Sequence, residues 1–471
     1  MSGKKVLILL PDGIGLRNFA YTDFYKKGLE MGFEMKFWNN TPFDLSSLGF
    51  QEVKINNAKP RPFTDLLKRS RTRIDLKLSK RRNSDPVYDS YIFPMAYRDV
   101  KSAIKNAIVK VLVAFHSSDA GVTKIRRKIV DSERQSDYYR QCLTTLKTEC
   151  PDIVLCTNQR PLTAISPIIA AQDLGIPTAT FIFSWDNLPK ATMVIETDYY
   201  FVWSKHMKAE LLEYYPYIDP EKIFITGTPQ FELHADGSLV QSRSEFFKAH
   251  KLDLSKKYIC YSGDDITTSP NDPQYLSDVA DAVRSINEKG GNLGLIFRRC
   301  PVDFSTRYDH VLSKNEDIIV QIAPKWKKVG EGWNTILPTQ HDMILQINTI
   351  FHTEMVVNLG SSMVFDYAAF DKPCAFINYD VPNSKHQNWS VDKIYKYVHF
   401  RSMPSKNSVV WLNNPAEIAS KLGLALQNPR ESITEAKRWF EIINQHPIEQ
   451  ASTRILNSVS EIINLQPAGK L

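Results

Sequence analysis

The stretch Lys5-Val-Leu-Ile-Leu-Leu10-Pro11-Asp12-Gly13-Ile14-Gly15 decides the fold class. Its apolar run up to Leu10 has the pattern of a parallel strand that is buried on both faces. The Pro-Asp-Gly turn ends that run, residues 18–31 then carry helical periodicity, and residues 34–38 give a second strand. This order of strand, helix and strand predicts a βαβ unit and therefore an α/β protein.

The same alternation continues to the end of the chain. The predicted strands of the first half are 5–10, 34–38, 152–156, 177–183, 199–203 and 222–226, and those of the second half are 258–261, 293–297, 318–321, 355–358, 374–378 and 409–412. Two α/β halves in series predict two Rossmann-like parallel-sheet domains that face a cleft.

Domain boundaries follow from composition. We expect an N-terminal, acceptor-side domain over 1–236, interrupted by a basic insertion at 54–135, and a C-terminal, donor-binding domain over 237–445. Residues 446–471 form a final helix that we place as a candidate to cross back to the first domain. A length of 471 residues suits two such domains.

Bulk composition indicates a cytoplasmic globular protein. Hydrophobic residues make up 43% and charged residues 24% of the chain, and no apolar run reaches the roughly 20 residues of a spanning helix. The six cysteines contain no CxxC pair and are interpreted as reduced thiols.

Positive charge is concentrated in the insertion. Residues 54–134 contain 20 Lys and Arg against 8 Asp and Glu, whereas the whole chain carries a net charge of +7. Within this region, Val100 to Phe115 has apolar residues at helical spacing with lysines alongside, which predicts an amphipathic basic helix. We interpret it as a surface for an anionic membrane; the alternative is that its apolar stripe packs onto the first domain. No nucleic-acid motif accompanies the charge.

The clearest candidate site follows the predicted strand 355–358. In parallel α/β sheets ligands bind at the carboxyl ends of strands, and here Gly360, Ser361 and Ser362 open a helix whose N-terminus suits a phosphate. Asp366 comes one turn later, within reach of a ribose or sugar hydroxyl. The alternative interpretation is a simple capping sequence.

Two other strand ends of the second half carry polar residues. Gly263 and Asp264 follow the strand 258–261, and Arg298 with Arg299 follows the strand 293–297. Arginine suits phosphate through its forked donors, and since neighbours on a strand point to opposite faces we expect one of the two to face the ligand. The alternative is a surface ion pair.

Asp12 and Asp186 follow buried strands of the first half. A transferase acting on a hydroxyl needs a general base, and a carboxylate can serve; the alternative for each is a turn aspartate that bonds its own backbone. The sequence contains no DxD, HExxH, GxSxG, GxGxxG or P-loop motif. We therefore predict no metal site and no bound cofactor.

These residues also resemble a known family. The stretch Asn358-Leu-Gly-Ser-Ser-Met-Val-Phe-Asp-Tyr367, followed by Asp371-Lys-Pro-Cys-Ala-Phe376, resembles the late motif of GT-B glycosyltransferases, closest to the branch with CDP-glycerol glycerophosphotransferases and capsule Kdo transferases. The resemblance implies that Ser361, Ser362 and Asp366 bind the donor. Arg298-Arg299-Cys300-Pro301 is similar to the branch's R-x-H-P segment, with Cys300 in place of histidine.

Two further segments carry the resemblance. Ser184-Trp-Asp-Asn-Leu188 is similar to a W-H-G motif whose histidine is catalytic in glycerophosphotransferases, but this chain has Asp186 there. Thr226-Gly-Thr-Pro-Gln-Phe231 resembles the T-G-x-P stretch near the domain crossover. The implied function is a metal-independent, inverting glycosyltransferase of bacterial surface-polysaccharide, capsule or lipopolysaccharide synthesis, acting at the inner face of the cell membrane on a glycan or lipid-linked acceptor. The rivals are a polyol-phosphate transferase, a UDP-sugar 2-epimerase and a non-catalytic sugar-binding or scaffold protein.

Overall fold

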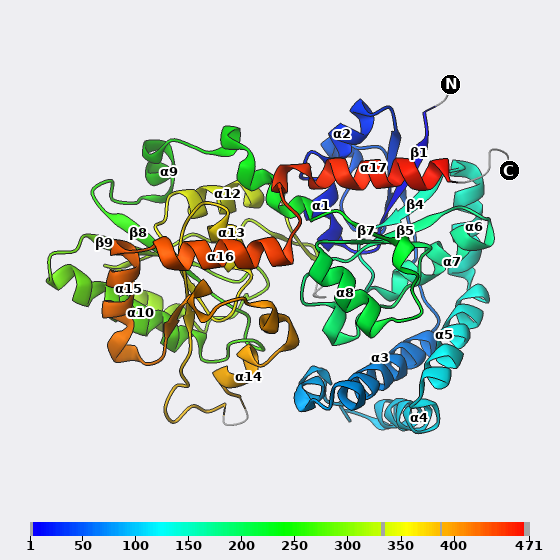
Figure 1. Cartoon of the computed structure of the whole chain (residues 1–471), viewed down its shortest axis with the longest axis horizontal. Helices are drawn as coiled ribbons and strands as arrows, with labels where there is room; N and C mark the ends of the chain where they lie inside the picture. The colour runs from blue at the N-terminus through cyan, green and yellow to red at the C-terminus, as the bar shows by residue number, and fades with distance from the viewer. Residues whose placement is uncertain (1–2, 331–334, 387–388, 466–471) are drawn as a thin grey trace. The chain divides into compact units, whose positions relative to one another are not determined.

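The structure of the chain, a computed structural model, describes residues 3–330, 335–386 and 389–465. It divides into two compact units (Figure 1). Unit 1 comprises Met1–Pro229 with Gln445–Leu471, and unit 2 comprises Gln230–Asn444. Each unit is built on one parallel sheet with helices packed against it, which confirms the predicted pair of Rossmann-like domains.

The sheet of unit 1 has seven parallel strands in the order β3-β2-β1-β4-β5-β6-β7. The strands are β1 (Lys5–Leu10), β2 (Glu34–Asn39), β3 (Glu52–Lys54), β4 (Ile153–Cys156), β5 (Thr178–Phe181), β6 (Tyr199–Val202) and β7 (Ile223–Ile225). Residues Val6 to Leu10 are fully buried, as expected for a strand with neighbours on both sides and helices above it. The strand order reverses between β1 and β4.

The sheet of unit 2 has six parallel strands in the order β10-β9-β8-β13-β14-β15. They are β8 (Lys257–Ser262), β9 (Leu293–Arg298), β10 (Ile319–Gln321), β13 (Val356–Asn358), β14 (Cys374–Ile377) and β15 (Val410–Leu412). Here the order reverses between β8 and β13. Among the described residues, β11 (Lys327–Lys328) and β12 (Ile336–Leu337) form a separate antiparallel pair.

All twelve predicted strands are present, with ends within two residues of the predicted ones. The strand β3 was missed because it has three partly or fully exposed residues, Glu-Val-Lys, and no apolar run.

The helices of unit 1 are α1 (Leu16–Phe19), α2 (Phe24–Glu30), α3 (Pro62–Asn83), α4 (Val100–His116), α5 (Asp119–Arg134), α6 (Asp137–Glu149), α7 (Ile165–Asp173), α8 (Lys205–Tyr214) and α17 (Ala451–Asn464). Those of unit 2 are α9 (Arg243–His250), α10 (Asp272–Glu288), α11 (Asp309–Lys314), α12 (Gln340–Phe351), α13 (Met363–Ala368), α14 (Val391–Tyr395), α15 (Ile418–Gln427) and α16 (Arg430–Ile443).

The basic insertion is helical and lies on the crossover from β3 to β4. Its helix α3 packs against α4 and α5, and α5 packs against α7. Ile74 of α3 and Ile125 of α5 are fully buried in one core cluster with Leu7 of β1 and Val154 of β4. The predicted helix over 100–115 is confirmed. The alternative that its apolar stripe packs onto unit 1 holds for Leu112, which packs against the core cluster, whereas Val100, Phe115 and the others of the stripe are exposed.

The last helix, α17, packs against α2 within unit 1. Arg454 of α17 donates from Nε to the carbonyl oxygen of Thr226 at 2.7 Å, just after β7. Helix α16 packs against α13 within unit 2. The chain therefore leaves unit 2 after α16 and ends on unit 1.

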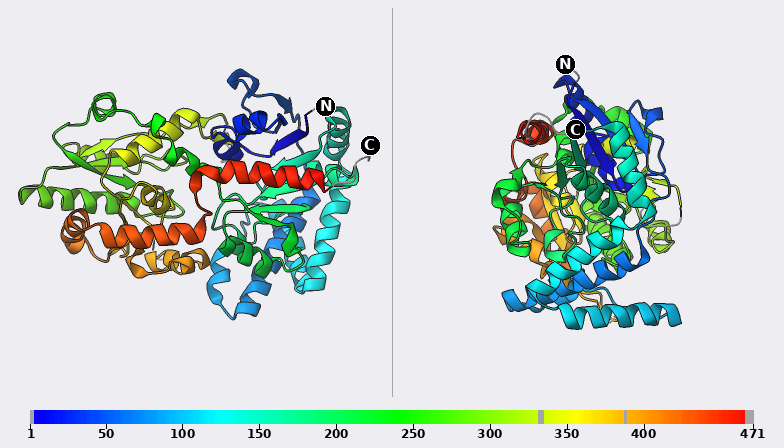
Figure 2. Two further views of the ribbon diagram at one scale, coloured as in Figure 1. Left: turned by 45° about the horizontal axis from the view of Figure 1, so that its top comes forward. Right: turned by 90° about the vertical axis from the view of Figure 1, so that its right-hand side faces the viewer.

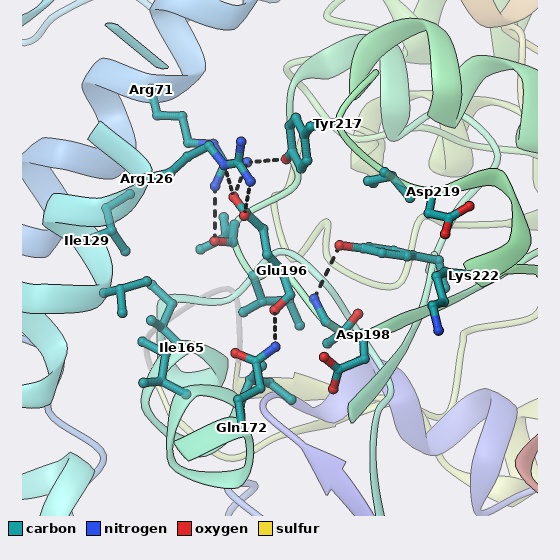
Figure 3. A pocket seen from close by; sticks show the side chains of 18 residues that line it. Arg71, Arg126, Ile129, Ile165, Gln172, Glu196, Asp198, Tyr217, Asp219 and Lys222 are labelled. Carbon is teal, nitrogen blue, oxygen red and sulfur yellow. Dashed lines mark hydrogen bonds and ion pairs between the residues drawn. The ribbon is translucent and has the colours of Figure 1, made fainter. Parts of the chain in front are cut away.

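A buried ion network joins the insertion to the sheet of unit 1 (Figure 3). Arg71 of α3 and Arg126 of α5 point toward Glu196, which precedes β6. Arg71 Nη2 lies 3.1 Å from Glu196 Oε1, and Arg126 Nε donates to the same oxygen at 2.5 Å. Tyr217 accepts a hydrogen bond from Arg71 at 3.0 Å and lies under the Arg126 guanidinium.

This network lines a cavity of about 320 Å³ at the amino ends of β6 and β7. Ligands of open parallel sheets bind at the opposite, carboxyl edge. We therefore assign the network a structural role. The side chain of Arg71 is only 4% exposed, so its charge depends for compensation on Glu196 and on Asp75, whose Oδ2 lies 3.6 Å from Arg71 Nε.

Replacing Glu196 by Gln leaves two guanidinium groups without their shared carboxylate. We expect the free energy of unfolding to fall by about 3 kcal/mol, measured by urea denaturation. Glu30→Gln removes the exposed i,i+4 partner of Lys26 and is the matched control, with an expected loss below about 0.5 kcal/mol.

The pH dependence provides a second check on this variant. Burial raises the pKa of Glu196, but the charge of Arg71 and the hydrogen bonds from Arg126 outweigh it, and the pKa is lowered from 4.5. The stabilisation that ionised Glu196 gives the folded protein is thus present above pH 4.5, and it is lost as the pH falls through the lowered pKa of Glu196. Equal losses in both variants at neutral pH would contradict the structural role.

Candidate functional site

In unit 1 the candidate site lies where the strand order reverses. Asp12 comes two residues after β1, and Asn158 comes two residues after β4. Asn158 Nδ2 donates to Asp12 Oδ2 at 2.8 Å, and the peptide N–H of Ile14 donates to Asp12 Oδ1 at 3.2 Å. The pair bridges the two strands at the point where open α/β sheets bind ligands.

The electrostatic environment of Asp12 suits proton transfer. Burial raises its pKa to about 6, opposed by the hydrogen bond from Ile14, the charge of Arg160 and the bond from Asn158. A carboxylate with a pKa near the working pH is ionised at neutral pH and still basic enough to take a proton. The hydrogen bond from the peptide N–H of Ile14 is the local backbone bond that the alternative interpretation of Asp12 predicts, and the role of Asp12 as a base stays a prediction.

Asp186 is committed to local partners. It follows β5 and accepts hydrogen bonds from Ser184 Oγ at 2.6 Å and from Asn187 Nδ2 at 3.0 Å. Lys190, four residues later, forms an ion pair with its other oxygen. Of the two aspartates predicted as bases, Asp186 is the one whose charge is directly compensated.

In unit 2 the candidate residues also lie at the reversal of strand order. Gly263 and Asp264 follow β8, and Gly360 to Ser362 follow β13. Because Val357 of β13 is paired with Tyr261 of β8, these two loops leave the sheet side by side. The sequence placed them at strand ends; the register shows that the strands are neighbours.

The loop after β13 is shaped for close approach. Gly360 has φ +65°, and a Cβ there would lie 3.0 Å from the ring of Phe400, so a larger residue is excluded. The peptide N–H of Ser361 donates to Asn358 Oδ1 at 2.9 Å, and Ser361 Oγ accepts from the N–H of Met363 at 3.3 Å. Ser361 thus accepts the first N–H of α13 from the turn before the helix, while Ser362 is the N-cap residue, makes no side-chain capping bond and is exposed.

The loop after β8 rests on a buried carboxylate. Asp272 accepts hydrogen bonds from Tyr308 at 2.6 Å, from Tyr261 at 2.9 Å and from the peptide N–H of Asp264 at 3.2 Å. Burial and the nearby charges of Asp272 and Asp265 raise the pKa of Asp264 well above 3.8.

The two arginines after β9 have different surroundings. Arg298 is buried and donates from Nη2 to Asp342 Oδ2 at 2.8 Å. Arg299 donates from Nη1 to the carbonyl oxygen of Ser305 at 2.7 Å and lies over the ring of Tyr308. The ion pair of Arg298 is thus buried and not the expected surface pair, whereas Arg299 is half-buried and lies 4.0 Å from the carboxylate of Asp309, which is exposed.

Comparisons with known proteins identify the fold. No protein-family model and no curated protein matches the sequence. Among solved structures, the chain is similar to a UDP-N-acetylglucosamine 2-epimerase described as putative from Listeria monocytogenes, at 13% identity and TM-score 0.55 over 99% of both chains. It is also similar to a glycosyltransferase from Rickettsia africae, at 10% identity and TM-score 0.51 over 98% of both chains. A third similar structure is a variant of the wall teichoic acid polymerase TagF, at 11% identity and TM-score 0.50 over 98% of this chain and 90% of that one.

This chain has the GT-B fold. Two parallel sheets of seven and six strands, spanning the whole length of such structures, carry that conclusion. The GT-B late motif carried Asp366 over as a donor ligand, but in this chain the Asp366 side chain is only 4% exposed. Its Oδ1 lies 2.8 Å from His234 Nε2 and accepts from Gln346 Nε2 at 3.3 Å. Asp366 lies in α13, the helix that begins at Met363 directly after this loop. Its contacts with His234 and Gln346 therefore help to fix the position of the loop after β13.

His234 is the residue that sequence reasoning missed. Its side chain is buried at 2% exposure, and it lies eight residues after Thr226, the start of the T-G-T-P stretch. The sequence spacing between His234 and Asp366 gives no signal of their contact; the nearby motif was the one available pointer. In the described part of the chain, no group of three or more His, Cys, Asp and Glu side chains is arranged to hold a metal ion.

Proposed function

We propose that this protein is a glycosyltransferase that moves a sugar from a nucleotide-activated donor to a hydroxyl group of a glycan or lipid-linked glycan in bacterial surface-polysaccharide biosynthesis. One observation carries the proposal. In both sheets, residues predicted from sequence lie where the strand order reverses: Asp12, which Asn158 contacts, in unit 1, and the loops of Gly263 and Gly360 in unit 2. These are the positions at which open α/β sheets bind ligands.

In the proposed reaction, unit 1 supplies the base and unit 2 binds the donor. In unit 1, Asp12 takes the proton of the acceptor hydroxyl, whose oxygen forms a bond to the anomeric carbon of the sugar. In unit 2, the loops after β8 and β13 hold the donor diphosphate, and Ser362 and Arg299 donate hydrogen bonds to it. The bond between the anomeric carbon and the phosphate oxygen breaks, and the nucleoside diphosphate leaves. Direct displacement of this kind inverts the anomeric centre and needs no metal ion.

The donor we propose carries UDP. The names of the similar Listeria structure and of a Staphylococcus aureus structure with UDP, MnaA, include that nucleotide. The same similarity keeps a UDP-sugar 2-epimerase as a rival, and the similarity to TagF keeps a polyol-phosphate transferase. Asp186 stands where the glycerophosphotransferases have the W-H-G histidine, which disfavours the polyol-phosphate transferase. Asp12 beside Asn158 is a candidate base for an acceptor hydroxyl, which favours the glycosyltransferase.

A nucleotide should stabilise the protein through the loop after β13. At a hundredfold excess over Kd, UDP is expected to stabilise the native state by about 2.7 kcal/mol and to raise Tm, measured by thermal shift against CDP, CMP, GDP and dTDP. Ser362→Trp fills this exposed position and should abolish the shift without changing the Tm of the free protein. Ser420→Trp, at an exposed serine of α15, is the control and should keep it. No shift with any of these nucleotides, or an equal shift in both variants, would refute the donor site.

Asp12 and Asp186 can be separated by their effect on turnover. We expect Asp12→Asn to lower kcat about 10²- to 10⁴-fold, because it removes the base, and Asp186→Asn to lower it less. In the wild type, kcat/KM should fall as the pH drops below about 6, since the base must be ionised. The readout is UDP release from the UDP-sugar in the presence of an acceptor glycan.

The opposite ranking of the two variants would assign the base to Asp186. Conversion of UDP-N-acetylglucosamine to its 2-epimer without an acceptor would instead identify an epimerase. Unchanged turnover in both variants would exclude both aspartates as the base, and no turnover by the wild type would favour the non-catalytic scaffold.

A further inference from the structure

The outward face of α4 carries an apolar stripe that is exposed. Val100 is 76% exposed, Ile104 56% and Phe115 81%. Of the 19 exposed large apolar residues among those the structure describes, seven lie between Phe93 and Phe115. An exposed apolar patch of this kind marks an interaction surface.

The residues of the apolar stripe lie on one face of α4. Val100, Ile104, Ile108, Val111 and Phe115 recur every three or four residues and so share one face of the helix. The opposite face, which includes Asn106 and Val109, is buried against unit 1. Figures 1 and 2 show α4 as the outermost helix of the insertion, with α3 on its inner side.

Positive charge flanks the stripe. Arg98, Lys101, Lys105 and Lys110 accompany it, and the acidic residue of the segment, Asp99, is occupied as the N-cap of α4, where it accepts from the N–H of Ser102 at 2.6 Å. Lysine is depleted from the cores of protein–protein interfaces. Apolar residues bordered by lysine and arginine are instead typical of helices that lie in a bilayer interface.

A basic groove opens beside the stripe. It has a volume of about 1010 Å³ between α3, the segment around Met95 and α4. Its lining includes five basic residues and two acidic ones, namely Arg73, Lys77, Lys80, Arg81 and Lys110 with Asp85 and Asp89. Tyr97, which precedes α4, and Lys110, which flanks the stripe, both line this groove, and Lys110 Nζ lies 5.5 Å from the centre of the Tyr97 ring. The groove therefore borders the helix that carries the stripe.

We propose that α4 and residues 93–99 dock this protein on an anionic phospholipid bilayer. The helix lies in the plane of the interface, with Phe93, Val100 and Phe115 among the acyl chains and the lysines at the phosphate headgroups; the groove receives headgroup phosphates. None of the described helices is long and apolar enough to cross a membrane. The inference rests on the exposed stripe and its charges and does not depend on glycosyl transfer.

The test is sedimentation of the whole protein with vesicles of phosphatidylglycerol and phosphatidylcholine, beside vesicles of phosphatidylcholine alone. We expect binding to the anionic vesicles that weakens with salt. The triple variant Val100→Ser, Ile104→Ser, Phe115→Ser should lower the partition coefficient at least about tenfold, because it removes the inserted apolar groups. The triple variant Lys101→Gln, Lys105→Gln, Lys110→Gln should lower it about fivefold per lysine, or about a hundredfold in all.

The matched control is Leu29→Ser, Leu254→Ser, Leu424→Ser, which removes three apolar side chains of 50–60% exposure elsewhere and should bind as the wild type does. All substituted positions are at the surface, and an unchanged Tm confirms folding. Absence of vesicle binding by the wild type, equal binding to neutral vesicles, or full binding by the serine variant would overturn the proposal. A wild-type dimer that the serine variant dissociates, without vesicle binding, would assign the stripe to a second copy of the chain and overturn it as well.

Discussion

The pairing of β1 with β4, and of β8 with β13, fixes where the strand order of each sheet reverses, which is where we propose that this chain binds its ligands. In each sheet these strands are neighbours in space but far apart in sequence, because the chain first builds one side of the sheet and then returns to build the other. The crossovers leave in opposite directions at that point, so the strand ends between them are uncovered. The candidate base, Asp12, and the two loops assigned to the donor all occupy these positions.

The same constraint explains how the insertion is tolerated. It lies on the connection from β3, at the sheet's edge, to β4, which must pass over the sheet in any case. Lengthening that crossover adds α3, α4 and α5 without moving a strand, and the network around Glu196 ties them down at the amino edge, away from Asp12. The scaffold thus gains an outer surface while its carboxyl edge stays unchanged.

The fold was predictable from sequence because buried parallel strands are short apolar runs with clear ends. The strand β3 escaped notice because an edge strand of three residues needs no such run. The positions of Asp12, Gly263 and Gly360 at strand ends were also predictable, since topology alone sets them. The partners of Asp366 and Arg298 were not: His234 and Asp342 lie 132 and 44 residues away in sequence, and spacing carries no information about contacts made through folding.

The exposure of the α4 stripe was likewise beyond sequence analysis. A helix of this pattern buries its apolar face in most proteins, and only the structure shows that α4 turns Asn106 inward and Phe115 outward. The sequence left both interpretations open. The packing of α3 against α4 leaves most of the stripe exposed, and docking on a membrane stays a proposal.

The central claim is that unit 2 binds the donor nucleotide through the loops after β8 and β13. Hydrogen–deuterium exchange of the whole protein, with and without UDP, tests this claim most directly. The account predicts slower exchange of amides near Gly263–Asp264 and Gly360–Ser362, with unit 2 protected more than unit 1. Protection confined to unit 1, or no change at saturating UDP, would contradict it.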